Sequence, residues 1–182
     1  MRIILTGTPG TGKTAVAARL AALAGGPLVD LNGFARSRKL FLKEKGAFGE
    51  KTVDVAKMGK LLAGELRGKK SFVVEGHLAC EFSAPADAVV VLRCDPRVLE
   101  KRLKKRGYPE EKIRENVLAE LLDYCLIKAE ANYGKPKIIQ VDSTRGTTAA
   151  AVFSKARRLR GDRVDWSRQL LDAKSLKRLV KE

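Results

Sequence analysis

One glycine-rich segment carries the residue types that bind nucleotide phosphates. Residues 7–14 read Gly-Thr-Pro-Gly-Thr-Gly-Lys-Thr and satisfy the pattern GxxxxGK[ST] of a phosphate-binding loop. Its glycines let successive backbone N–H groups turn inward around the β-phosphate. Lys13 can bridge the β- and γ-phosphate oxygens, and the Thr14 hydroxyl is suited to Mg²⁺. The segment therefore predicts that the chain binds a nucleoside triphosphate. The residues expected to contact this nucleotide are Gly10, Gly12, Lys13, Thr14 and Ala15.

A carboxylate and a histidine stand close to one another further along the chain. Glu75 ends the apolar run 71–75, so its side chain should emerge at the carboxyl edge of a sheet, beside the phosphate loop. We expect it to hold Mg²⁺ directly or through water, the alternative being an ordinary strand-end acid. His77, the only histidine, follows two residues later. An imidazole beside the γ-phosphate can orient or deprotonate a water, although a lone histidine is usually a packing or surface residue.

The elements that must position these residues alternate along the chain. The expected strands are 2–6, 27–31, 71–75, 88–93 and 137–141. The expected helices are 14–23, 53–66, 96–106, 110–132, 147–160 and 168–180. Continuous β-branched runs are typical of strands covered on both faces. The order predicts one α/β domain, a five-stranded parallel sheet with helices on both faces, and leaves 33–52 unassigned.

Composition excludes several classes of protein. The chain has 182 residues, of which 45% are hydrophobic and 32% charged, so it can form a core and disorder throughout is excluded. Its longest apolar runs, such as 88–92, are far too short to span a membrane, and no signal peptide can be read. The three cysteines show no CxxC spacing. We therefore expect buried thiols in a reducing compartment, a cytoplasmic location and no membrane partner.

The positive charge is concentrated in three segments. The formal net charge is +16, and residues 36–60, 97–114 and 155–182 contribute +5, +5 and +6. They can be lysine-rich solvated surfaces that only aid solubility. They can also meet polyanions, which would be nucleotide phosphates for the first two segments and RNA for the third.

The rest of the sequence narrows the class of phosphate-loop protein. A GTPase should offer an NKxD-like guanine reader, and the sequence has none. A short domain with basic, helix-rich insertions after its second and fourth strands looks like a nucleoside monophosphate kinase. The first insertion, about 30–53, would receive the acceptor, and the second, about 103–113, would close over ATP as a lid. Closure matters because water competes with the acceptor for the γ-phosphoryl group.

Four segments in this order carry a more specific resemblance. They are GTPGTGKT (7–14), GFAR (33–36), VVEGH (73–77), and RGY (106–108) followed by Lys112-Ile113 and Glu115-Asn116. Together they resemble the adenylate kinase isoenzyme 6 family, which includes the coilin-interacting nuclear ATPase and its archaeal counterparts. The similarity runs from residue 2 to about residue 160.

The resemblance implies an activity and a set of partners. It implies an ATP–AMP phosphotransferase that also hydrolyses ATP and helps to mature the small ribosomal subunit by binding a ribosomal protein. It implies a role for His77 in hydrolysis, and the family has Asp where this chain has Glu75. An ATP-switched assembly factor, in which slow hydrolysis resets affinity for a ribosomal protein or RNA, is the rival interpretation.

The resemblance also assigns roles to three arginines. It matches Arg36 to the arginine that binds AMP, although the neighbouring Arg38 and Lys39 could substitute. Arg102 lies one helical turn before Arg106, and one of the two would neutralise charge on the transferring phosphoryl group or stack on adenine. The resemblance matches Arg106 to the lid arginine that touches ATP, and it matches Arg145 to a basic residue bordering adenine. The expected catalytic residues are Lys13, His77 and Arg106.

The remaining features have open interpretations. Arg93 can be catalytic or can form a structural salt bridge, and Cys80 and Cys94 are interpreted as structural. We expect residues 1–160 to form the kinase-like domain, and 161–182 to form a basic helical extension that either packs on it or contacts rRNA.

Overall fold

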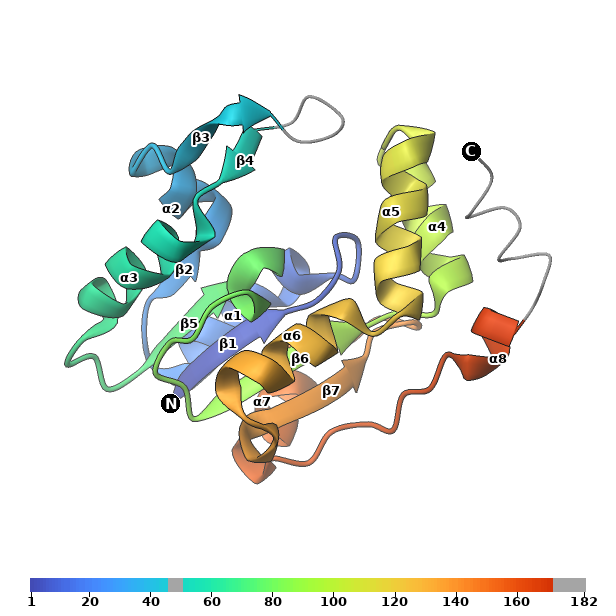
Figure 1. Cartoon of the computed structure of the whole chain (residues 1–182). Coiled ribbons are helices and arrows are strands. Elements are labelled where there is room, and N and C mark those ends of the chain that lie inside the picture. Colours follow the sequence, from blue (N-terminus) through green and yellow to red (C-terminus); the bar gives the residue numbers. More distant parts are fainter. Residues whose placement is uncertain (46–50, 172–182) are drawn as a thin grey trace.

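A parallel sheet forms the centre of the molecule in the computed structural model, which describes residues 1–45 and 51–171 (Figure 1). The strand order is β2-β5-β1-β6-β7, and every pairing within this sheet is parallel. The predicted five-stranded parallel sheet is therefore confirmed. The strands are β1 (Arg2–Thr6), β2 (Leu28–Asp30), β5 (Phe72–Glu75), β6 (Ala88–Arg93) and β7 (Ile138–Asp142).

Helices cover both faces of this sheet because its strands are apolar on both sides. In β1, Ile3 and Leu5 point to one helical layer, while Ile4 points to the other, and all three are fully buried. Such burial on both faces explains why the strands are continuous apolar runs. The first layer holds α1 (Lys13–Ala24) and α7 (Ala149–Arg158), and the second holds α3 (Val55–Leu66) and α6 (Tyr124–Tyr133).

The segment that the sequence left unassigned forms a short helix and a hairpin. Asp30 ends β2, and its carboxylate accepts hydrogen bonds from the backbone N–H groups of Asn32 and Gly33, at 3.0 and 3.1 Å. This cap starts a helix that propensity alone does not indicate. The elements are α2 (Leu31–Ser37), β3 (Phe41–Lys45) and the antiparallel β4 (Lys51–Val53).

The elements α2, β3 and β4 form one arm at an edge of the sheet, and a second arm rises from the same edge (Figure 1). It consists of α4 (Pro96–Lys105) and α5 (Glu110–Leu121), which pack together as a helical hairpin. A separate cluster of buried residues holds this hairpin together. Its members are Cys94, Leu99, Leu103, Ile113, Val117 and Leu121.

The single helix predicted over 110–132 is wrong, because the structure breaks it in two. The first part, α5, ends at Leu121, and the second, α6, begins at Tyr124. Between them Asp123 has a φ of +56°, a left-handed conformation that no helix continues. Its carboxylate pairs with the buried guanidinium of Arg93. Helical spacing cannot reveal this pairing, because Arg93 lies on a strand.

The C-terminal segment packs on the second arm. Residues 161–166 lead to α8 (Ser167–Leu171), and Trp166 packs against the cluster between α4 and α5. The helix expected over 168–180 lies mostly outside the described residues. Two short 3-10 helices, at His77–Cys80 and Lys135–Lys137, complete the described part of the chain. No helix within it is long and apolar enough to cross a membrane.

Candidate nucleotide site

The phosphate loop joins the end of β1 to the start of α1. Gly10 has a φ of +94°, and a Cβ built there would lie 2.7 Å from the Leu99 side chain of α4. This left-handed conformation favours glycine, and any Cβ there would force the Leu99 side chain to shift. The first turn of α1 carries no acidic residue and no side-chain cap. Its N-terminal N–H groups and its dipole are thus available to an anion.

Lys13 lies folded back on this loop. Its ammonium group donates to the carbonyl oxygens of Gly7 at 2.8 Å and Thr8 at 3.1 Å, and the residue is 7% exposed. Burial lowers the pKa of Lys13, and nearby acids, including Glu75, only partly oppose this. The side chain is therefore held over the position where the loop would carry a phosphate.

Thr14 and Glu75 form the expected pair for a divalent cation. The Thr14 hydroxyl donates to Oε1 of Glu75 at 3.3 Å, and β5 ends beside β1, with Glu75 opposite Leu5. Burial raises the pKa of Glu75, although the Lys13 charge opposes the rise. One hydroxyl and one carboxylate suit Mg²⁺, which normally takes its other ligands from phosphates and water. These two side chains fit that role.

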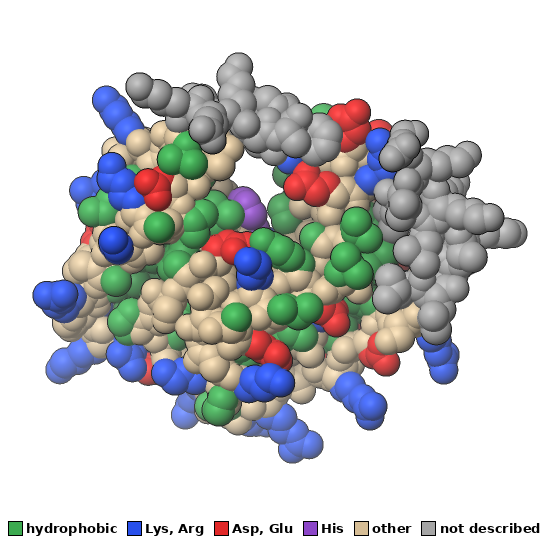
Figure 2. Space-filling model, in the orientation of Figure 1, with side chains coloured by type: hydrophobic (Ala, Val, Ile, Leu, Met, Phe, Trp, Pro, Cys, Tyr) green, Lys and Arg blue, Asp and Glu red, His purple; other side chains and the backbone are tan. Residues whose placement is uncertain are grey.

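His77 stands at the first turn after β5, in the hollow between the two arms (Figure 2). Its backbone carbonyl accepts hydrogen bonds from the Thr6 hydroxyl and from Sγ of Cys80, both at 3.2 Å. These contacts fix the turn below the imidazole. Burial and the nearby Lys13 charge lower the pKa of His77 to about 4. The imidazole is therefore neutral at pH 7 and can accept a hydrogen bond.

A cavity of about 500 Å³ opens beside the phosphate loop, between α4 and the loop after β7. Arg106, the C-cap of α4, is an exposed residue on the wall of this cavity. Arg145 is also exposed and lies next to the lining residue Gly146, but it is not itself part of the wall. The wall is formed by Gly10, Thr11, Gly12, Ala15, Val16, Arg102, Lys105, Arg106, Ser143, Gly146 and Thr147.

Arg102 and Ser143 also shape this cavity. Arg102 donates through Nη2 to the carbonyl oxygens of Ser143 at 2.8 Å and Thr144 at 3.0 Å, and so ties α4 to the loop after β7. The Ser143 hydroxyl contacts the carbonyl oxygen of Thr11 at 2.6 Å. The loop after β7 is thereby fixed to both α4 and the phosphate loop. Sequence position did not distinguish Arg102 from Arg106. In the structure Arg102 anchors the loop after β7, whereas Arg106 is an exposed cation.

The arm formed by α2, β3 and β4 distinguishes Arg36 from Arg38. Arg36 lies exposed in the last turn of α2 and makes no ion pair with the described residues. Arg38 instead donates to Oε2 of Glu65 at 3.0 Å, with its guanidinium 5.7 Å from the centre of the Phe34 ring. Arg38 is thus engaged on α3, which leaves Arg36 available to an anionic ligand.

Arg93 has a structural role rather than an exposed catalytic one. Its side chain is 2% exposed and pairs with Glu120 at 2.8 Å. Neither Glu120 nor this network was identified from the sequence. Glu120 is one of several charged residues on its helix, and no sequence motif marks it as buried. The cysteines called structural, Cys80 and Cys94, are indeed buried, and burial raises the pKa of Cys94 to about 11.

Known proteins are similar to this chain in sequence. The AAA domain family model matches residues 3–123. A protein of Pyrococcus furiosus named "Putative adenylate kinase" is 41% identical over 152 residues, covering 84% of this chain and 80% of that one. A protein of Methanocaldococcus jannaschii with the same name is 30% identical over 177 residues, covering 94% and 96%.

Solved structures share the fold. A gluconokinase from Sinorhizobium meliloti superposes with a TM-score of 0.56 at 20% identity, covering 87% of this chain and 92% of that one. A shikimate kinase from Bacteroides thetaiotaomicron gives 0.54 at 22% identity, covering 87% and 95%. At such identities the likeness concerns the fold alone. The sequence relatives go further, and the chain therefore belongs to the family of these archaeal proteins named as adenylate kinases, as a P-loop nucleotide kinase.

Proposed function

We propose that the protein transfers the γ-phosphoryl group of MgATP to AMP, so that ATP and AMP become two ADP. The observation that carries this proposal is the placement of the phosphate loop between two different arms. The cavity lined by Arg106 lies on one side, and the arm carrying Arg36 rises from the same sheet edge on the other (Figure 1). A loop with a cavity on one side and a basic arm on the other suits two nucleotides meeting at the γ-phosphate. Segments 30–53 and 103–113 would be the acceptor insertion and the lid.

The chemistry requires no side-chain nucleophile. An oxygen of the AMP phosphate attacks the γ-phosphorus, while the bond from that phosphorus to the β–γ bridging oxygen breaks and leaves ADP. Lys13 would contact the β- and γ-phosphate oxygens, and Arg106 would add charge from the lid. Thr14 and Glu75 would hold Mg²⁺, which when bound neutralises charge on the transferring group. Gly10, Gly12 and Ala15 would supply backbone N–H groups, Arg145 would border adenine, and Arg36 would bind the AMP phosphate.

ATP hydrolysis is the second activity that we propose for this site. The pKa of His77 is lowered to about 4, so its imidazole can accept a hydrogen bond from water at neutral pH. A water positioned there would replace AMP as the nucleophile. The resemblance to adenylate kinase isoenzyme 6 supports the same role.

The alternative function is an ATP-switched factor in small ribosomal subunit maturation, acting on a ribosomal protein or rRNA. The net charge of +16 favours it. The C-terminal extension gives it less support, because Trp166 packs against the second arm rather than facing solvent as an RNA contact would. Residues 172–182, which hold much of the expected rRNA contact, lie outside the described residues.

The test is ADP production from MgATP by the purified protein, with and without AMP at matched ionic strength, with Lys13→Ala as the inactive control. A rate at least tenfold higher with AMP, and two ADP per ATP consumed, supports the kinase. Slow hydrolysis that AMP leaves unchanged contradicts it and favours the assembly factor. Full turnover by Lys13→Ala would remove the phosphate loop from the mechanism. Otherwise that variant should lose 10²-fold or more, about what removing one donor to a developing charge costs.

A further inference from the structure

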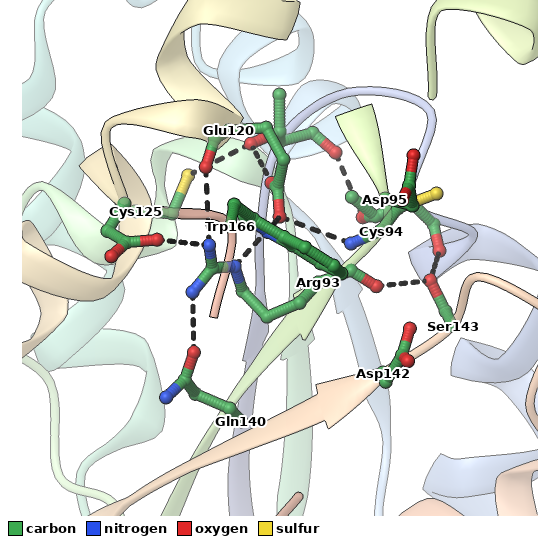
Figure 3. Close-up of polar contacts among 12 residues, drawn as sticks. Arg93, Cys94, Asp95, Glu120, Cys125, Gln140, Asp142, Ser143 and Trp166 are labelled. Atoms are coloured by element: carbon green, nitrogen blue, oxygen red, sulfur yellow. Dashed lines mark hydrogen bonds and ion pairs between the residues drawn. The ribbon is translucent and has the colours of Figure 1, made fainter. Parts of the chain in front are cut away.

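The carboxylate of Glu120 is a junction of four hydrogen bonds, three of them buried. Glu120 lies in the last turns of α5 and is 2% exposed. Its Oε1 accepts from Nε of Arg93 at 2.8 Å, the Cys94 N–H at 3.1 Å and Nε1 of Trp166 at 3.2 Å. Its Oε2 accepts from the Thr8 hydroxyl at 2.7 Å. One side chain thus joins the phosphate loop, the end of β6, the second arm and the C-terminal segment (Figure 3).

Opposite charges meet within this junction. Burial opposes the charge of Arg93, but Glu120 and Asp123 keep the pKa of its guanidinium above the ordinary value. Arg93 also donates to the Gln140 side chain, and its guanidinium lies 5.9 Å from the centre of the Trp166 ring. A buried network in which every member is satisfied holds one arrangement and resists alternatives. The position of Glu120 relative to β6 is therefore fixed.

Thr8 connects this junction to the phosphate-binding lysine. Thr8 is a variable position of the loop motif and is 1% exposed. Its hydroxyl donates to Glu120, while its carbonyl oxygen accepts from Nζ of Lys13 at 3.1 Å and from the Thr11 hydroxyl at 2.9 Å. The hydrogen bond to Glu120 thus fixes the residue on which the Lys13 ammonium rests.

We propose that Glu120 is a positioning residue, which through Thr8 holds the phosphate loop in the shape that presents Lys13 to phosphate. Through Trp166 the same carboxylate couples the loop to residues 161–171. This inference deepens the proposed function. It rests on that function only where the rate of phosphoryl transfer to AMP is measured. A merely structural role for the Thr8 hydroxyl would affect stability and leave the reaction rate alone.

The first test compares Thr8→Val with Thr8→Ser, because both leave the Arg93–Glu120 pair intact. Thr8→Val should lower kcat for ATP turnover by about 10- to 100-fold with a smaller change in KM, since a small misplacement of a reacting group costs that much. Thr8→Ser should restore most of the rate. Ser71→Ala is the matched control, because it removes a hydroxyl-to-carbonyl hydrogen bond at the opposite edge of the sheet. Thr8→Val keeping kcat within twofold of wild type, or Thr8→Ser losing as much as Thr8→Val, would overturn the proposal.

The second test uses Trp166, the only tryptophan of the chain, as a fluorescent reporter. Binding of a non-hydrolysable ATP analogue, followed independently by calorimetry, should change its emission in the wild type and much less in Thr8→Val. Binding without any change in wild-type emission would disprove the coupling to residues 161–171. This measurement needs no AMP and no turnover, so it stands apart from a failure of the proposed kinase activity.

Discussion

The Thr14 hydroxyl lies 3.3 Å from Oε1 of Glu75, although 61 residues separate them in the chain. Thr14 belongs to the first turn of α1, and Glu75 is the last residue of β5. Parallel pairing of β5 with β1 brings them together, because it places the end of one strand beside the loop that follows the other. The contact joins the two side chains that we propose for Mg²⁺.

Glu75→Gln should raise the Mg²⁺ concentration needed for half-maximal ADP production by about 10- to 100-fold. The amide keeps the shape of the side chain but lacks the charge that attracts the cation. Titration of the rate with Mg²⁺ at saturating ATP measures the effect. Glu65→Gln serves as the control, since that carboxylate pairs with Arg38 away from the loop. An unchanged Mg²⁺ requirement would leave Glu75 as an ordinary strand-end acid.

Arg36→Ala should raise the KM for AMP by about tenfold or more and change the KM for ATP little. A charged hydrogen bond to phosphate contributes about 1.5–3 kcal/mol, and that contact would be lost from the acceptor alone. Arg38→Ala is the matched control on the same arm, because its guanidinium pairs with Glu65. Steady-state rates with each nucleotide varied in turn measure both constants. Equal effects of the two substitutions would place the AMP phosphate elsewhere.

His77→Ala should lower ATP hydrolysis by about 10²-fold and phosphoryl transfer by much less. An imidazole that accepts a hydrogen bond from the attacking water assists hydrolysis by about this factor. Only water needs this help, because the AMP phosphate is already an anion. Phosphate release without AMP and ADP formation with AMP measure the two reactions on one preparation. Equal losses in both would remove the water-orienting role.

Replacing His77 should also change how stability depends on pH. Its pKa is about 4 in the folded protein and 6.5 ordinarily, so between these values the unfolded chain binds a proton that the folded chain excludes. The wild type should therefore lose stability as pH falls from about 6.5 towards 4, by at most about 1.4 kcal/mol per pH unit. His77→Gln should lack this contribution. Urea unfolding of both proteins across that range measures it, and parallel curves would show that the imidazole titrates normally.

The sequence determined the local elements and the residues whose chemistry depends on neighbours in the chain. The loop 7–14 lies between an apolar strand and an alanine-rich helix, so both its conformation and its ligand class follow from local spacing. The five parallel strands followed from β-branched runs alternating with helical periodicity. The same strand assignment placed Glu75 at a strand end, whereas the role expected of His77 came from the family resemblance.

Tertiary structure decided the features that depend on contacts between distant segments. Asp123 breaks the helix expected over 110–132 because its carboxylate pairs with Arg93, 30 residues earlier. The tie between Thr8 and Glu120 spans 112 residues, and neither residue belongs to a recognisable pair in the sequence. Among the described residues Arg38 is paired and Arg36 is not, because α3 places Glu65 beside Arg38. Local sequence patterns indicate secondary-structure propensity and hydrophobic periodicity. The partner of a buried charge is decided only by tertiary packing.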